Sequence, residues 1–434
     1  MRATDPEPGS HVKSVTLLAT IGTVAEYYDF ALAGACAALV WPFVFFPSSS
    51  SAAGFALSFG TYGSALLFQP VGAALFGHLG DRRGRKPSLV LTLSLMGIGS
   101  LGLGLVPSYE AIGALAPLLV VAMRVLQGIG FGGELSGSAT WVAEAAADTN
   151  RRSFWTGFLS VSRTAGALLS FSMFYAVSAV LPRAEFLGSG WRLLFIGGAA
   201  ALLVGVVVRY RFTRDILYLE AKARNALVKA PVISAAKKDW GTILALGVST
   251  TGFLSIILVM LQSFSLNYLT KVGVGVTFAA ELLVLGRTPE LVVTPAATLL
   301  ADRFGRKATL IAGGVACLIP ILLFYPLLHT SSVGPVVLGF ALLGISSSFG
   351  YASAPALFAE SFPTSHRFSG VGLAYNIPVL VTGSLTTLVI PLYIAAFGGA
   401  VGAANYVAIT IFGITAVSIV AGLVVHETRT ADMH

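Results

Sequence analysis

The chain has 434 residues, of which 56% are hydrophobic and 11% are charged, and its net charge is +8. Soluble domains carry about 25% charged residues, so this composition excludes a large soluble domain and indicates a surface that faces lipid. The cations stand between apolar runs, which indicates membrane topology and argues against nucleic-acid binding. Cys36 and Cys317, both inside apolar runs, are too few for a metal site. We expect neither a metal nor a cofactor.

Apolar segments long enough to cross a bilayer, about 20 residues each, recur twelve times. The first six are 15–45, 53–76, 89–106, 112–142, 154–180 and 191–208, and the second six are 243–269, 276–300, 310–328, 336–358, 370–396 and 407–425. They predict an all-α polytopic membrane protein with twelve transmembrane helices in two pseudo-symmetric six-helix bundles. The expected divisions are a tail (1–14), the first bundle (15–208), a linker that is partly an amphipathic surface helix (209–240), the second bundle (241–426) and a tail (427–434).

Lysine and arginine gather in the loops that follow every second span, as they do in cytoplasmic loops. These residues are Arg82, Arg83, Arg85, Lys86, Arg151, Arg152, Arg211, Arg214, Arg303, Arg306, Lys307 and Arg367. The opposite loops hold little beyond Arg183 and Lys271. We therefore expect a multi-pass protein of the cell membrane with both termini in the cytoplasm.

Two repeats support the division into halves. Residues 77–87 read Gly-His-Leu-Gly-Asp-Arg-Arg-Gly-Arg-Lys-Pro, and 302–307 repeat this chemistry as Asp-Arg-Phe-Gly-Arg-Lys, offset by 302 − 81 = 221. Glu144 precedes Arg151 by seven, and Glu360 precedes Arg367 by seven, with an offset of 216 (360 − 144 and 367 − 151). Repeats of this kind in transporters place the substrate site between the halves, near the bilayer midplane.

Three further motifs are Gly-Thr-Val-Ala-Glu-Tyr-Tyr-Asp-Phe at 22–30, Arg-Val-Leu-Gln-Gly-Ile-Gly-Phe-Gly-Gly-Glu at 124–134, and Phe-Pro-Thr-Ser-His-Arg-Phe-Ser-Gly at 362–370 with Tyr-Asn at 375–376. Together with 77–87 they resemble the major facilitator superfamily, and within it the metabolite:H⁺ symporter family. The resemblance covers nearly the whole chain. It implies alternating access and proton-coupled import of small organic acids or zwitterionic osmolytes. The chain departs from the family's pattern at Gln69, Arg163 and Arg287, which bears on the substrate.

Ionisable side chains within the spans should be paired or functional, because each costs about 2.5–3.5 kcal/mol at the bilayer centre. Glu26 and Asp29 share a helical face, where repulsion and burial favour a proton on one of them. The resemblance pairs a first-helix acid with the helix-four arginine, here Asp29 with Arg124. We assign proton coupling to Asp29, with Glu26, Arg124 and Glu134 as further candidates; a permanent structural ion pair is the alternative.

Arg163 lies on a helix face lined by small residues, and its guanidinium suits two-pronged binding of a carboxylate. It is therefore a predicted substrate ligand; the alternative is a salt bridge to Glu134 or Glu26. Arg287 and Glu290 are spaced for an intrahelical pair, so mutual neutralisation is favoured over a substrate role for Arg287. The other predicted substrate contacts are Tyr28, Gln127, Tyr375 and Asn376.

The loop charges predict a latch on the cytoplasmic side. Asp81 can accept hydrogen bonds from the N-terminus of a neighbouring helix or from Arg151 and Arg152, and Arg85 can reach Glu144. Breaking such a cluster costs free energy that substrate or proton binding must offset. The predicted gating residues are Gly77, Gly80, Asp81, Arg82, Arg85, Glu144, Arg152, Asp302, Arg303, Arg306, Glu360 and Arg367.

Four alternatives compete with anion symport. An enzyme is disfavoured because the sequence has no metal-ligand set, nucleophile elbow or phosphate-binding loop. A transporter-like sensor is disfavoured because it would need a signalling domain or a long tail, and both expected tails are short. Betaine or proline is the alternative substrate, and a facilitator is the alternative mechanism, but arginines within the membrane favour a mono- or dicarboxylate. The expected partners are a small-molecule substrate, H⁺ and the lipid bilayer, with no nucleic acid, and the protein is expected to be a monomer.

Overall fold

The computed structural model describes residues 8–212, 230–431 and 433; within them the structure is helical, without strands. The first bundle consists of α1 (Pro8–Leu39), α2 (Trp41–Val44), α3 (Ser51–Arg83), α4 (Arg85–Leu105), α5 (Tyr109–Ile112), α6 (Leu115–Ala145), α7 (Arg152–Val180), α8 (Arg183–Glu185), η1 (Phe186–Gly190) and α9 (Trp191–Phe212). After α11 (Pro231–Lys238), the second consists of α12 (Trp240–Ser255), η2 (Ile256–Ser263), α13 (Phe264–Lys271), α14 (Val276–Arg287), α15 (Glu290–Phe304), α16 (Arg306–His329), α17 (Val333–Tyr351), α18 (Ala354–Glu360), η3 (Thr364–His366), α19 (Arg367–Ser384), η4 (Leu385–Val389), α20 (Ile390–Ala396) and α21 (Ala400–Val424).

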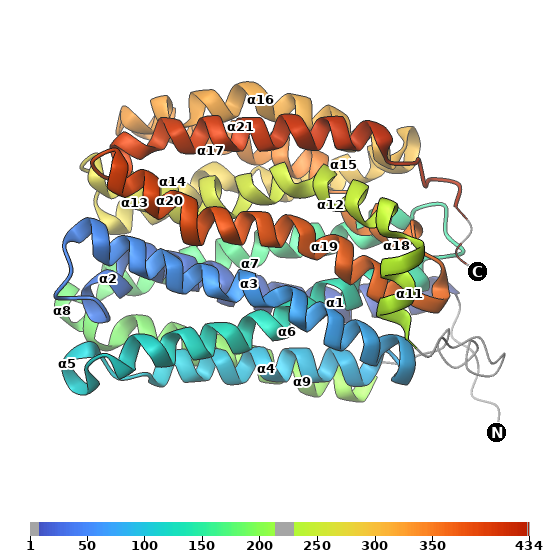
Figure 1. Ribbon diagram of the computed structural model, residues 1–434, viewed down its shortest axis with the longest axis horizontal. Coiled ribbons are helices and arrows are strands. Elements are labelled where there is room, and N and C mark those ends of the chain that lie inside the picture. The colour runs from blue at the N-terminus through green and yellow to red at the C-terminus, as the bar shows by residue number, and fades with distance from the viewer. Residues whose placement is uncertain (1–7, 213–229, 432, 434) are drawn as a thin grey trace.

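The long helices run roughly side by side, with the two bundles as upper and lower halves in Figure 1. Several segments continue one another (α12–η2–α13, α14–α15, α17–α18 and α19–η4–α20), so the described residues form the twelve predicted rods. Eight rods are long and apolar enough to cross a membrane by composition alone. The other four are α1, α3, α7 and α14–α15, and all four carry buried charged side chains, which lower their mean hydropathy.

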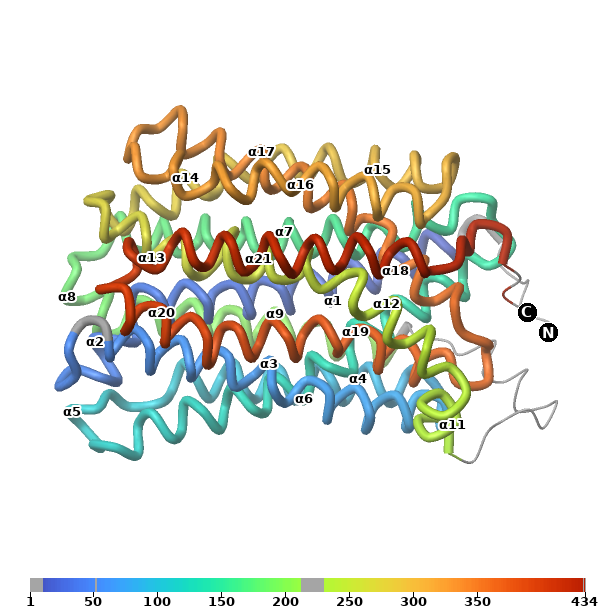
Figure 2. The backbone as a smooth tube through the Cα atoms, turned by 45° about the horizontal axis from the view of Figure 1, so that its top comes forward, coloured from blue at the N-terminus to red at the C-terminus, as the bar shows by residue number. Residues whose placement is uncertain are grey.

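The two bundles meet along helices of both halves. Helix α3 packs against α19 and α20, and helix α7 packs against α14 and α15. Figure 2, turned by 45°, shows the same pairs side by side. Residues far apart in the sequence are thereby brought to one interface, which is where a substrate site between repeats is expected.

Glycines determine how closely α3 and α6 approach. A Cβ at Gly128 would lie 2.1 Å from the carbonyl oxygen of Ala65, and one at Gly132 would lie 1.9 Å from that of Gln69. Both distances are far below van der Waals contact, so the two backbones touch at these positions. This close packing of small residues is common between membrane helices, and it fixes the position of Glu134, two residues further along α6.

The two repeated loop motifs adopt the same turn. Gly84, between α3 and α4, has φ +100°, and Gly305, between α15 and α16, has φ +109°. This left-handed region is open to glycine at little cost. The two positions differ by 305 − 84 = 221, the offset of the motif itself. The charged side chains beside these turns therefore gather at one end of the molecule, which we call the charged end.

Helix α9 continues to Phe212, so Arg209 is a helical residue and not the first residue of a linker, as the sequence suggested. The sequence predicts Arg209 outside the bundle because this charged residue directly follows the apolar run that ends at residue 208. Residues 213–229 of the predicted linker lie outside the described residues. The described part contains α11, which packs against α19 and α3, and Asp239, whose carboxylate contacts the Nε2 of buried His366 at 2.7 Å.

Candidate functional site

A cavity lies between the two bundles, at the middle of their long helices. Its volume is about 10 Å³, room for about one water molecule, so the cavity is nearly closed in this conformation. Its polar lining residues are Tyr27, Gln69, Tyr351 and Tyr375, and its apolar ones are Phe30, Leu66, Phe131, Leu135, Leu254, Leu258 and Val379. The Nε2 of Gln69 and the hydroxyl of Tyr375 are buried and lack hydrogen-bond partners among the described residues. These groups are therefore available to a bound molecule.

Arg163, on α7, lies next to this cavity. Its side chain is buried, and none of its three guanidinium nitrogens has a hydrogen-bond partner in the described part of the chain. The guanidinium carbon is 5.7 Å from the ring centroid of Tyr351, which lines the cavity. A buried guanidinium without partners is costly, and Arg163 thus has five donor hydrogens available for an anion.

The predicted alternative for Arg163, an ion pair with Glu134 or Glu26, is not formed among the described residues. Glu134 instead binds Arg209 of α9, and it also accepts hydrogen bonds from Ser138 at 2.6 Å and Thr92 at 2.7 Å. Arg209 is not among the predicted site residues, because it directly follows an apolar run and so lies in the predicted linker.

Asp29 does not contact Arg124 directly, contrary to the pairing that the resemblance implied. The amide of Gln127 stands between them: its Nε2 donates to the Asp29 carboxylate, and its Oε1 accepts from Arg124 Nη1 at 2.7 Å. In this orientation the amide nitrogen of Gln127 faces the anion and its oxygen faces the cation; the flipped amide would make neither hydrogen bond. Ser100 also donates to Asp29, and Arg124 Nη2 donates to the carbonyl oxygen of Tyr62 at 3.2 Å. A proton on Asp29 can therefore affect Arg124 through Gln127.

Glu26 is fully buried one helical turn before Asp29. Its carboxyl group lies beside that of Glu134 and near Arg209, and its oxygens accept no hydrogen bond from the described residues. Two carboxyl groups therefore share one guanidinium. This arrangement can take up a proton without leaving an unbalanced positive charge in the membrane.

Arg287 and Glu290 form the predicted intrahelical pair. Arg287 Nε is 2.7 Å from Glu290 Oε1, and Nη2 is 3.1 Å from Oε2. The Oε2 atom also accepts from Thr164 of α7 at 3.0 Å and from Ser348 of α17 at 3.1 Å. The pair thus links α14–α15 to the first bundle next to Arg163, while the Arg287 guanidinium is held by its own helix.

Two predicted substrate contacts point elsewhere. The hydroxyl of Tyr28 donates to the carbonyl oxygen of Leu194 at 3.2 Å, and Asn376 Nδ2 donates to that of Gly372 at 2.7 Å. Neither side chain lines the cavity. Tyr27 lines it instead, because neighbouring positions on a helix differ by about 100°. Of the predicted contacts, Tyr375 lies in the lining, stacked on Phe358 with ring centroids 4.2 Å apart.

At the charged end, the first repeat forms a network that joins the two bundles. Asp81 accepts hydrogen bonds from the backbone nitrogen and hydroxyl of Ser369 at 2.9 and 2.6 Å, at the N-terminus of α19. Arg85 contacts Asp81 at 2.9 Å and Glu144 at 3.0 Å. Glu144 also binds Arg367 of the second bundle at 3.2 Å. Of the two partners considered for Asp81, the helix N-terminus is the one found.

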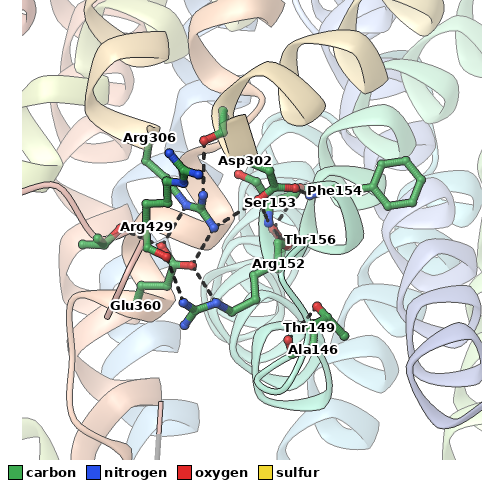
Figure 3. Close-up of polar contacts among 12 residues, drawn as sticks. Ala146, Thr149, Arg152, Ser153, Phe154, Thr156, Asp302, Arg306, Glu360 and Arg429 are labelled. Carbon is green, nitrogen blue, oxygen red and sulfur yellow. Dashed lines mark hydrogen bonds and ion pairs between the residues drawn. The ribbon is translucent and has the colours of Figure 1, made fainter. Parts of the chain in front are cut away.

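The second repeat forms the same network with the bundles exchanged: its acids lie in the second bundle and bind residues of the first, as Figure 3 shows. Asp302 accepts from the backbone nitrogens of Ser153 and Phe154 at 3.0 and 2.9 Å, at the N-terminus of α7. Arg306 binds Glu360 at 2.9 Å, and Glu360 also binds Arg152 of the first bundle at 3.2 Å. Arg152, and not Arg151 as the repeat spacing suggested, matches Arg367, because each is the first residue of its helix.

Burial raises the pKa of the Asp81 carboxyl above its usual range, although Arg85 and Ser369 oppose the shift. Burial likewise raises the pKa of Asp302 and of Glu360.

The remaining predicted gating residues surround these acids. A Cβ at Gly80 would lie 2.2 Å from the ring of Phe368, and one at Gly77 would lie 3.2 Å from the Cα of Ser369. Arg82 and Arg303 are exposed.

Comparisons with known proteins agree with this architecture. A family model described as sugar (and other) transporter matches residues 15–212 and 232–431. The shikimate transporter of Escherichia coli K12 is 32% identical over 406 residues, which are 92% of each chain. The proline/betaine transporter of the same strain is 30% identical over 397 residues, covering 88% of this chain and 78% of the relative.

The citrate–proton symporter of Klebsiella pneumoniae is 31% identical over 393 residues, covering 86% of this chain and 83% of the relative. Among solved structures, a partially occluded inward-open form of the xylose transporter XylE from E. coli is similar, with a TM-score of 0.74. That likeness covers 96% of this chain and 99% of the other at 20% identity, and it shows the fold.

Proposed function

The chain belongs to the sugar (and other) transporter family within the major facilitator superfamily, and on this premise we propose that it imports a small organic anion together with H⁺. It is a multi-pass membrane transporter and not an enzyme. The proposed substrate is a mono- or dicarboxylate metabolite. The proposed mechanism is alternating access, in which the two bundles open the cavity to one side of the membrane at a time.

The observation that carries this proposal is the unpartnered guanidinium of Arg163. It lies against Tyr351, and its three nitrogens lack acceptors among the described residues, whereas Arg287 is held by Glu290. Membrane arginines are normally paired. An organic carboxylate entering the cavity would supply the missing acceptors of Arg163, with the hydroxyl of Tyr375 and the amide of Gln69 as further contacts.

Proton coupling is proposed for Asp29, acting on Arg124 through Gln127. Protonation of Asp29 removes the charge that Gln127 and Ser100 now solvate, and it weakens the hold on Arg124. The Glu26–Glu134 pair beside Arg209 is a second proposed proton carrier. The name of the citrate–proton symporter relative supports coupling to protons.

A zwitterionic osmolyte is the second candidate substrate. Phe30, Tyr27, Tyr351 and Tyr375 line the cavity with aromatic rings, and such rings bind quaternary ammonium groups. The proline/betaine transporter relative favours this class. A betaine also carries a carboxylate for Arg163, so the two candidates differ in what faces the aromatic rings.

Orientation and assembly are also proposals. We assign the charged end to the cytoplasm, because cytoplasmic loops collect arginine and lysine. Both termini would then be cytoplasmic. A single chain contains both repeats and the cavity between them, so we propose that the monomer is the transporting unit.

The experiment is uptake into proteoliposomes with an acidic exterior and a neutral lumen. Radiolabelled mono- and dicarboxylates are compared with betaine and proline, and liposomes without protein correct for passive entry. The proposal predicts accumulation of at least one carboxylate, which collapses when a protonophore removes the gradient. Accumulation of betaine or proline alone would transfer the assignment to the osmolyte class. Gradient-independent equilibration would indicate a facilitator.

A further inference from the structure

Residues 427–431 and 433 lie along the charged end. Glu427 accepts hydrogen bonds from the backbone nitrogens of Arg306 and Lys307 at 3.0 and 3.1 Å, at the start of α16. Thr428 donates to Glu360 Oε2 at 2.6 Å, and Arg429 Nη1 donates to the carbonyl oxygen of Arg303 at 2.7 Å. Residues 427–429 are therefore anchored on the second bundle.

The next residues cross to the first bundle. Arg152 of α7 donates from Nη1 to the carbonyl oxygen of Ala431 at 2.8 Å and from Nη2 to that of Arg429 at 3.1 Å. At the far end of the segment, the carbonyl oxygen of Met433 accepts from Arg367 Nη2 at 3.1 Å and from Thr364 at 3.2 Å. The Met433 side chain is only 3% exposed, so the segment is packed as well as hydrogen-bonded.

The two arginines that hold this segment are those that join the bundles. Arg152 uses Nε for Glu360 and gives both Nη atoms to backbone carbonyl groups of the segment. Arg367 uses Nη1 for Glu144 and gives Nη2 to the segment. Figure 3 shows Arg152 and Arg429 on either side of Glu360. If the segment left, buried guanidinium groups would lose acceptors, which disfavours its departure while the charged end is closed.

We propose that residues 427–431 and 433 form a tail strap that holds the charged end closed. The strap is fixed to the second bundle by Glu427, Thr428 and Arg429, so opening at this end requires Arg152 to release the carbonyl oxygens of Arg429 and Ala431. Release of the strap from Arg152 is thus a step of the transport cycle. This role is independent of which metabolite is carried, and it goes beyond the charge networks of the two repeats.

The test measures opening directly by electron spin distances. Spin labels are attached to cysteines placed at Asn150 in the first bundle and Ala308 in the second, which are exposed at the charged end; Cys36 and Cys317 are buried. Truncation after Glu427 keeps the contacts of Glu427 with α16 and removes the rest of the strap. The proposal predicts a shift toward a longer-distance population relative to the full chain. An unchanged distribution in the truncated protein would overturn it.

A milder variant covers the case in which the truncated protein does not fold. Arg429→Ala removes the contact with the Arg303 carbonyl and leaves the chain length unchanged, so it should give the same shift to a smaller extent. Arg183→Ala is the control, since it removes an exposed arginine at the opposite end of the molecule. If the spin-label distances in Arg429→Ala matched those of the unsubstituted chain, the strap would be contradicted. An equal shift in Arg183→Ala would contradict it too.

Discussion

At the scale of single residues, the account depends on one unpaired cation and one indirectly paired acid. Arg163 has no hydrogen-bond acceptor among the described residues. Arg124, Arg209 and Arg287 each have at least two. The paired arginines stabilise the bundles. Arg163 is therefore the residue whose substitution should change binding with the least change in the fold.

Arg163→Lys tests the form of the binding site. Lysine keeps the charge but loses the planar fork that binds a carboxylate through two hydrogen bonds. We expect the KM for the carboxylate to rise at least about tenfold, which is ~1.4 kcal/mol, with little change in thermal stability. Initial uptake rates over a substrate series measure this. Arg183→Lys serves as the matched control, and equal KM values for wild type and Arg163→Lys would rule out the two-pronged site.

Asp29→Asn tests proton coupling. The amide cannot ionise, so the variant should lose accumulation driven by a pH gradient and retain exchange of labelled for unlabelled substrate. Both activities are measured in the same proteoliposome preparation. Tyr28→Phe is the control, because its hydroxyl binds only the Leu194 carbonyl in the described structure. If Asn at this position still supports gradient-driven accumulation, the proton is carried elsewhere.

At the scale of elements, the two repeats build one latch twice. An aspartate in each repeat, Asp81 or Asp302, binds the N-terminus of a helix in the opposite bundle, where the partial positive charge of the helix favours an anion. The arginine of each motif binds a glutamate, and an arginine of the opposite bundle binds the same glutamate. The closed charged end is thus held by two equivalent networks related by the pseudo-symmetry.

Asp81→Asn and Asp302→Asn should therefore have similar effects. Each replaces a charged acceptor at a helix N-terminus by a neutral one, which costs about 0.3–1 kcal/mol for the dipole interaction alone. We expect both to favour the state that is open at the charged end and to reduce turnover more than affinity. Uptake kinetics separate the two quantities. A fall in affinity without a fall in turnover in either variant would contradict the latch.

Sequence patterns could predict the elements better than the contacts between them. Hydropathy and loop charge located the twelve rods, and the motif at Gly84 and Gly305 predicted the repeated turn. The Asp29–Gln127–Arg124 chain was missed because a bridging amide has no charge, although Gln127 lies one turn from Arg124 on α6. Arg209 was missed because it directly follows an apolar run. The strap was missed because Arg152 and Arg367 bind backbone carbonyl oxygens, which every residue has.

At the scale of the whole molecule, the cavity and the charged end lie on the same interface between the bundles. Arg163 and the second latch share helix α7, since Ser153 and Phe154 at its N-terminus bind Asp302. Thr164, next to Arg163, binds Glu290 of the opposite bundle. A change in the charge around Arg163 can therefore bias how α7 sits against α14–α15, which connects substrate binding to opening.

The most direct measurement of the central claim is proton movement caused by the substrate itself. Proteoliposomes containing a pH-sensitive dye are given the carboxylate with equal pH on both sides, and protein-free liposomes correct for passive entry of the acid. The account predicts acidification of the lumen with wild-type protein, in proportion to carboxylate uptake, and its loss in Asp29→Asn. Carboxylate entry through the wild-type protein without acidification would contradict it.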